Sequence, residues 1–260
     1  MATIPVRSMD LGRVLSTGFN ALSKNAVPFF GVAFVLSGLP GFVMQYWLLG
    51  IATENPSIEL VLSWQFWGPI LGSIVIAFLS ATILQGTLIG ATVRHLSGRP
   101  VHIGQSINGA LARIIPIILV SLLVGICVIF GLLLLIVPGI IFYLMFVVAI
   151  PVMMAEGRGV TDSMSRSASL TKGSRPMIFL LLIIMGMVSG GVSAVCNAIF
   201  GRIAEVSGDT AADMITLSLG ATVNGTITSA FSAVMIAALY IELRNVKEGA
   251  STEEIADVFA

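Results

Sequence analysis

The stretch Ile114–Ala155, IIPIILVSLLVGICVIFGLLLLIVPGIIFYLMFVVAIPVMMA, decides the fold class of this chain. It holds no charged side chain, and Arg113 directly precedes it. About 20 apolar residues cross the ~30 Å hydrocarbon layer of a bilayer, so the stretch is long enough to cross twice. Pro138 lacks the N–H that a helix interior needs, and Gly139 tolerates unusual backbone angles. We therefore predict a transmembrane hairpin with its turn at Ile136–Gly139.

The composition of the whole chain agrees with this interpretation. Hydrophobic residues make up 57% of the sequence and charged residues 10%, with a mean hydropathy of +1.03. Such a chain cannot cover a water-facing surface with polar groups, which indicates an integral membrane protein. Cys127 and Cys196 both lie in apolar stretches, where cysteine behaves as a small hydrophobe, and no metal or disulfide is expected there. No cleavable signal peptide is expected, since the first apolar run begins only near Ala26.

Apolar runs and periodicity extend the hairpin to an all-α fold of six transmembrane helices. The predicted spans are Val27–Ile51, Phe66–Val93, the two halves of Ile114–Ala155, Pro176–Phe200 and Met214–Leu243. Three short amphipathic helices suited to the membrane interface are predicted at Leu11–Lys24, Ile103–Arg113 and Val160–Lys172. Polar loops are predicted at Thr53–Ser63 and Gly201–Ala212.

These elements suggest a single membrane domain over residues 1–247, followed by an acidic cytoplasmic tail at 248–260. In each third of the domain an amphipathic helix ends in a basic residue, a proline begins a span, and two spans follow. The repeat units are about 9–93, 103–155 and 160–244. The predicted architecture is three helical hairpins, each preceded by a cytoplasmic interfacial helix. Chance similarity among apolar sequences is the alternative explanation.

The positive charges predict the orientation. If both termini are cytoplasmic, twelve of the thirteen Lys and Arg residues lie inside, and only Arg202 lies outside. A bias of this kind in short loops usually determines topology, so we predict an N-in, C-in protein.

Gly38, Pro40 and Gly41 predict a break within the first span, because proline removes an internal hydrogen bond and glycine adds backbone freedom. Two explanations stay open. Neighbouring helices can repair such a kink, or a discontinuous helix can line a binding site.

A family resemblance rests on four blocks, which are Val137-Pro138-Gly139-Ile140-Ile141, Ala149-Ile150-Pro151-Val152, Glu156-Gly157-Arg158-Gly159 and Ser167-Ala168-Ser169-Leu170-Thr171-Lys172-Gly173. This pattern resembles the bacterial inner-membrane family named for the membrane domain of glycerophosphoryl diester phosphodiesterase. The resemblance implies a six-span, multi-pass domain of the bacterial inner (cytoplasmic) membrane that is sometimes attached to a phosphodiesterase and often stands alone, with no catalytic residues to carry over; this sequence shows no phosphodiesterase domain.

The residues themselves argue against catalysis. The enzyme that gives that family its name needs a soluble barrel of about 250 residues, whereas nearly all of this chain forms spans. The only histidines, His95 and His102, have no carboxylate near them in sequence. No span carries an ionisable group near its middle, which disfavours ion-coupled transport, and Gln85, Asn197 and Asn224 are expected to form interhelical hydrogen bonds. We expect no enzyme activity, no cofactor, no metal and no nucleic-acid partner.

Basic residues at the predicted cytoplasmic face carry the functional hypothesis. The basic ring, as we name it, comprises Arg13, Lys24, Arg94, Arg99, Arg113, Arg166, Lys172 and Arg175. Each base near an anionic leaflet contributes about 1 kcal/mol of attraction, which predicts binding of anionic lipid headgroups or docking of a partner. The simpler explanation is that these residues only set topology. Two other functions stay open, an accessory or scaffold subunit of a larger complex, with a protein partner or a second copy of the chain, and an uncoupled facilitator for a lipid or small solute.

Overall fold

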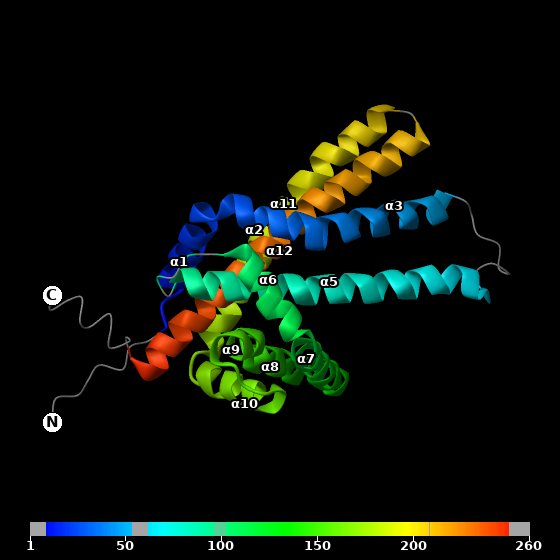
Figure 1. The fold of residues 1–260 in the computed structure, drawn as a ribbon. Coiled ribbons are helices and arrows are strands. Elements are labelled where there is room, and N and C mark those ends of the chain that lie inside the picture. The colour runs from blue at the N-terminus through cyan, green and yellow to red at the C-terminus, as the bar shows by residue number, and fades with distance from the viewer. Residues whose placement is uncertain are drawn as a thin grey trace, which may run out of the picture. The chain divides into compact units, whose positions relative to one another are not determined.

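The structure, a computed structural model, describes residues 9–53, 62–96, 98, 100, 102–207 and 209–249. Throughout these ranges the ordered elements are helices (Figure 1). They are α1 (Leu11–Lys24), α2 (Ala26–Ala33), the π-helix η1 (Phe34–Gly38), α3 (Leu39–Thr53), α5 (Trp64–Leu96), α6 (Ile103–Ala112), α7 (Ile114–Leu134), α8 (Ile136–Phe146), α9 (Ala149–Glu156), α10 (Val160–Thr171), α11 (Arg175–Ser207) and α12 (Thr210–Glu248). Most of the predicted loop at Thr53–Ser63, Arg99 of the basic ring and tail residues 250–260 lie outside the described residues.

The all-helical fold and the six membrane spans are confirmed at the level of length and composition. The candidate spans are Ala26–Gly50, Phe66–Leu96, Ile114–Leu134, Ile136–Glu156, Arg175–Val206 and Thr210–Glu248. The last two are longer than predicted, because α11 continues to Ser207 through most of the stretch that we predicted as the polar loop Gly201–Ala212. That part of the loop prediction is wrong. Its apolar Ile203, Ala204 and Val206 allow the helix to extend to Ser207.

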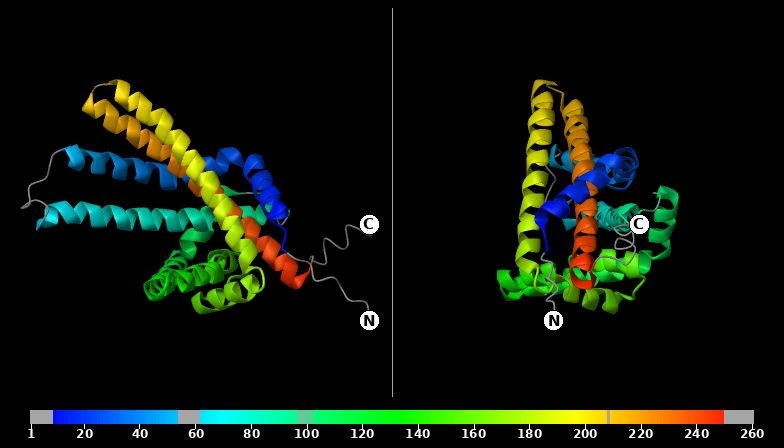
Figure 2. Two further views of the ribbon diagram at one scale, coloured as in Figure 1. Left: turned by 180° about the vertical axis from the view of Figure 1, so that it is seen from behind. Right: turned by 90° about the vertical axis from the view of Figure 1, so that its left-hand side faces the viewer.

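By its internal contacts the chain divides into two compact units. Unit 1 consists of Met1–Asn25, Gln85–Ile184 and Ala233–Ala260, and unit 2 of Ala26–Leu84 and Met185–Ser232. The boundaries fall inside α5, α11 and α12, so each of these long helices contributes to both units (Figure 2). The three predicted repeat units follow a different division of the sequence.

In unit 1, α7 and α8 pack against each other through two glycines near the centre of the long apolar stretch. Leu135 is the single extended residue between α7 and α8, so the chain turns one residue before the predicted Ile136–Gly139. Pro138 stands in the first turn of α8, where its missing N–H costs nothing. A Cβ on Gly131 would lie 2.7 Å from the Gly139 Cα atom, so these backbones approach too closely for any side chain.

The α8–α9 junction is stabilised by hydroxyl groups from α10. Carbonyls in the last turn of a helix lack intrahelical partners, and Met145 belongs to the last turn of α8. Its carbonyl oxygen accepts a hydrogen bond from the Ser167 hydroxyl at 2.7 Å and a longer one from Thr171 at 3.5 Å. Ser167 and Thr171 are fully buried, so α10 packs against the helices before it in sequence (Figure 1).

The rows that α1 and α10 bury differ from the apolar faces that suit these helices to a membrane interface. On α1 that face comprises Leu11, Leu15, Gly18, Phe19 and Leu22, of which only Gly18 is buried, together with Val14 and Ala21. Gly18 meets Met235 of α12, whose sulfur would lie 2.5 Å from an added Cβ. On α10 the face comprises Val160, Met164, Ala168 and Thr171, of which only Thr171 is buried, and the buried row is Ser163, Ser167, Leu170 and Thr171. Both helices therefore use small side chains for close packing within unit 1.

Unit 2 contains the predicted helix break, and the helix continues through it as a π-helix. Leu39 N–H donates to the Phe34 carbonyl, the wider hydrogen-bond pattern of a π turn, and Pro40 follows in the first turn of α3. Gly38 is buried against α12, and a Cβ there would lie 2.6 Å from the Thr226 hydroxyl oxygen. This contact favours the explanation that a neighbouring helix stabilises the break. It argues against a broken helix that lines a binding site at Gly38. On α11 and α12, Ser193 donates to the Asn224 side chain at 3.0 Å, which confirms the interhelical hydrogen bond expected for Asn224.

The Gly131–Gly139 contact generates a stability prediction. Gly131→Ala should lower the free energy of unfolding by about 1–3 kcal/mol, because the added methyl group overlaps the α8 backbone. Gly125→Ala on the same helix has no atom within 4 Å of the added Cβ and is the matched control. Thermal unfolding of the purified protein in detergent measures both. Equal melting temperatures for the two variants would contradict the close approach.

Candidate functional site: the charged groups of unit 1

Charge separates sharply between the two units. Twelve Lys and Arg residues and eight Asp and Glu residues fall within the ranges of unit 1. Unit 2 holds five acidic residues and a single basic one, Arg202. The two units are distinguished by their internal contacts and not by their charge. The difference in charge between them is therefore a separate observation. Every member of the predicted basic ring belongs to unit 1.

Glu156 is the centre of the largest charge network in the described part of unit 1. It ends α9, and its carboxylate accepts from Arg158 at 2.5 Å, from Arg166 of α10 at 3.3 Å and from the Tyr240 hydroxyl of α12 at 3.2 Å. Arg166 also pairs with Glu248, which in turn pairs with Arg244 at 2.9 Å. These ion pairs connect α9, α10 and the end of α12. The Glu156 side chain is 14% exposed, so water screens its interactions less than those of a surface pair.

A second carboxylate, that of Glu242, is buried and receives the start of α1. Its oxygen lies 2.9 Å from Arg13 and accepts the Asp10 backbone N–H at 3.3 Å. Asp10 also caps α1, since its side chain accepts the backbone N–H of Gly12 at 2.8 Å. Glu242 is 6% exposed, and this pairing satisfies a charge that would be costly if left alone. The contact fixes α1 to α12.

Arg113 interacts with the C-terminal end of α9. Gly157 ends that helix in the left-handed conformation with φ +66°, which glycine adopts without a steric penalty. The Arg113 side chain donates to the Met154 carbonyl at 3.1 Å, and a cation at a helix C-terminus is favoured by the helix dipole. The sequence block Glu156-Gly157-Arg158-Gly159 is therefore a structural junction between α9 and α10.

The described members of the basic ring consequently fall into three groups. Arg13, Arg113 and Arg166 are held by protein oxygens, as described above, and Arg94 donates to Gln105 at 2.9 Å. Lys24 at the end of α1 and Lys172 after α10 are exposed. Arg175 begins α11, and its Nε atom is buried without a hydrogen-bond acceptor among the described residues.

Sequence reasoning did not identify the carboxylates of Glu156 and Glu242 as partners of the basic ring. Glu156 and Glu242 each follow a long apolar run, which is an unusual place for a charge in a membrane protein. That signal could have singled them out. Tyr240 gave no such signal, because an aromatic residue near the end of a span is common.

The family comparison covers nearly the whole fold. Residues 9–243 match the family described as "Domain of unknown function (DUF7847)". The chain belongs to this family. No curated protein and no solved structure matches the chain. The resemblance to the membrane domain of glycerophosphoryl diester phosphodiesterase stays a prediction.

The Glu156 network predicts a selective loss of stability. Glu156→Gln should lower the free energy of unfolding by about 1–3 kcal/mol, since Arg158, Arg166 and Tyr240 lose a charged acceptor that is largely buried. Glu205→Gln is the control, because Glu205 is 69% exposed and pairs with Arg202 only at 3.5 Å. Thermal unfolding in detergent should show a lower melting temperature for the first variant and no change for the second. The opposite order would show that the network is not a stabilising junction.

Proposed function

We propose that this is a non-catalytic, multi-pass membrane protein that binds anionic phospholipid through the basic residues of unit 1 and so organises lipid in its membrane. The observation that carries the proposal is the charge separation between the units. A unit rich in bases attracts an anionic leaflet, and the attraction decays over a Debye length of about 10 Å. Lipid binding needs no active site, cofactor or metal.

The exposed lysines are the residues best suited to this role. Lys24 and Lys172 are exposed at helix ends, and their flexible side chains reach toward headgroups while the helices stay packed. The arginines that hold carboxylates or carbonyls would instead keep unit 1 folded. We therefore assign lipid contact to the exposed lysines and not to the arginines that are paired within unit 1.

The finer topology is part of this proposal. We infer an N-in, C-in orientation in a bacterial inner membrane, with the bases of unit 1 at the cytoplasmic leaflet and Arg202 outside. The positive-inside rule supports this orientation. Three hairpins with interfacial helices α1, α6 and α10 are part of the proposed arrangement, but Leu132 and Gly139 beside the α7–α8 turn lie close to the first turns of α11, so this hairpin does not run parallel to α11. The partly exposed row Leu11, Leu15, Phe19 and Leu22 of α1 supports contact with lipid there.

Each of the two alternative functions predicts a specific result. An accessory or scaffold subunit would retain a stoichiometric protein partner, or a second copy of itself, after gentle extraction. A facilitator for a lipid or small solute would need a path through unit 2 near Pro40 and Gly41. The buried contact of Gly38 with Thr226 weakens that second alternative.

Neutralising the exposed lysines tests the proposal. The double variant Lys24→Gln, Lys172→Gln should lose preference for phosphatidylglycerol over phosphatidylcholine, because each base near the surface contributes about 1 kcal/mol, a factor of about five. The wild-type and variant proteins are reconstituted into vesicles with equal parts of the two lipids and extracted in mild detergent. Mass spectrometry of the intact protein then identifies the lipid that each retains.

The matched control is Arg202→Gln, which removes the one basic residue of unit 2, a side chain that is 84% exposed. It should retain the wild-type lipid ratio. A double lysine variant that also keeps the wild-type ratio would overturn lipid binding by the exposed bases. Raising the salt concentration should reduce the preference of the wild-type protein, since exposed charges are screened.

A further inference from the structure

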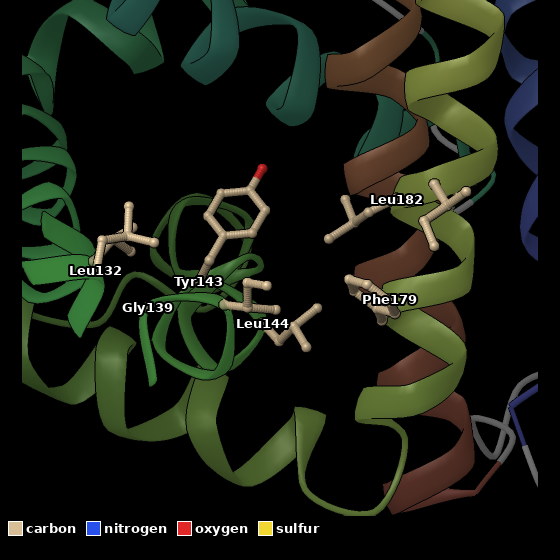
Figure 3. A pocket seen from close by; sticks show the side chains of 9 residues that line it. Leu132, Gly139, Tyr143, Leu144, Phe179 and Leu182 are labelled. Carbon is tan, nitrogen blue, oxygen red and sulfur yellow. The ribbon is translucent and has the colours of Figure 1, made fainter. Parts of the chain in front are cut away.

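An apolar cavity opens in unit 1 between α7, α8 and α11. Its volume is about 360 Å³, within the range of about 300–1,000 Å³ typical of small-molecule sites. Its walls are formed by Val128, Leu132, Gly139, Ile140, Tyr143, Leu144, Phe179, Leu182 and Ile183. Figure 3 shows Phe179 and Leu182 of α11 on one side, across from Leu132, Tyr143 and Leu144. The Tyr143 hydroxyl is the only side-chain polar group among the residues that line it.

The cavity lies at the side of the candidate spans and not in a sealed core. Phe179 and Ile183 line it and are nevertheless 42% and 43% exposed, so the opening faces the surroundings of the spans. For a membrane-spanning segment those surroundings are hydrocarbon chains. An apolar recess in contact with lipid is filled by the molecules already there, since an empty recess would forfeit the dispersion contacts of its walls.

Arg175 stands one helical turn from the cavity. Residues 175, 179 and 182 are spaced by four and three positions on α11, so they lie on one face of the helix. The Cβ atoms of Arg175 and Phe179 are therefore about 5–6 Å apart. No hydrogen bond or ion pair holds the Arg175 side chain within the described part of the chain, and its Nε is buried without an acceptor. Arg175 also begins α11, where the helix dipole favours an anion.

We propose that this cavity binds an acyl chain of one anionic phospholipid, whose phosphate accepts hydrogen bonds from Arg175. The proposal rests on the proposed function and adds a discrete, stoichiometric site to it. Charge complementarity commits the site to an anionic lipid. Guanidinium donors pair with phosphate oxygens in a two-point geometry, and exposed Lys172 lies three residues earlier in the sequence. Phosphatidylcholine also carries a phosphate, but its choline cation offsets that charge, so the cations Arg175 and Lys172 favour a lipid with a net negative headgroup.

Filling the cavity tests its occupancy. Leu182→Trp places a large ring among the cavity walls, whereas Leu180→Trp adds the same ring at a neighbouring position of α11 that does not line the cavity and is 43% exposed. Both variants are made in the full chain and reconstituted with equal parts of phosphatidylglycerol and phosphatidylcholine. After mild extraction, mass spectrometry of the intact protein counts the retained lipids. Wild type and Leu180→Trp should retain one phosphatidylglycerol per chain. Leu182→Trp should reduce that occupancy about fivefold or more.

Removing the guanidinium tests the headgroup half of the site. Arg175→Gln should lower the selectivity of the retained lipid for phosphatidylglycerol over phosphatidylcholine about fivefold. Equal retention of the two lipids by the wild-type protein would overturn the proposal, as would a retained lipid unaffected by both Leu182→Trp and Arg175→Gln. Retention of no lipid by wild type would overturn it as well.

A second measurement does not depend on the folding of any variant. Phosphatidylglycerol with a photoactivatable group in its acyl chain is bound to the wild-type protein and cross-linked, and the labelled peptides are identified. Labelling should concentrate on residues 128–144 and 179–183. Labels spread evenly over all spans would overturn the site.

The outcomes separate this site from the proposed function. Loss of the tight lipid in Leu182→Trp, with a wild-type lipid ratio in the Lys24→Gln, Lys172→Gln variant, would support the cavity and reject binding by the exposed lysines. The converse result would reject the cavity and leave the proposed function standing.

Discussion

Hydrocarbon offers no hydrogen bonds, and the structure depends on that constraint. A polar group that reaches the spans is costly unless it finds a partner within the chain. Helices satisfy most of their own backbone groups, Ser167 donates to the Met145 carbonyl and Ser193 to the Asn224 side chain, whereas the Thr87 and Thr92 hydroxyls and Arg175 Nε are buried without a partner among the described residues. Where no polar partner is needed, glycines let backbones meet directly, as Gly131 and Gly139 do. Small residues therefore serve both close packing and hydrogen bonding in this fold.

The same constraint explains how the charges are used. A carboxylate at the end of an apolar helix is costly unless cations surround it, and Glu156 and Glu242 are both paired with arginines. Those arginines are thus structural, although in sequence they are indistinguishable from bases that face a headgroup. Pairing within the protein divides one apparent set of bases into a structural part and an exposed part, Lys24 and Lys172.

Composition and apolar run length were sufficient to predict the helical fold and the six spans, because both follow from the thickness of the hydrocarbon layer. The positions of α1, α6 and α10 followed from helical periodicity, and α1 matches its predicted bounds. Their buried faces did not follow. A hydrophobic stripe predicts contact with any apolar medium, and lipid is as apolar as a protein interior, so it does not reveal which face meets another helix. Ser163 and Ser167 of α10 are buried because small side chains admit close contact, a property that hydropathy does not measure. The candidate site was predictable only as a list of bases, since the pairing of Arg13 with Glu242 joins residues 229 positions apart.

The hydrogen bond from Ser167 to the Met145 carbonyl spans 22 residues of sequence, and this has a consequence for biogenesis. A membrane protein enters the bilayer as it is synthesised, so α8 and α9 leave the ribosome before α10 exists. During that interval the hydroxyls of Ser167 and Thr171 are not available to the Met145 carbonyl, and a polar group without a partner is costly in hydrocarbon. The partner of this junction thus comes from a short polar helix that is made after the apolar segment.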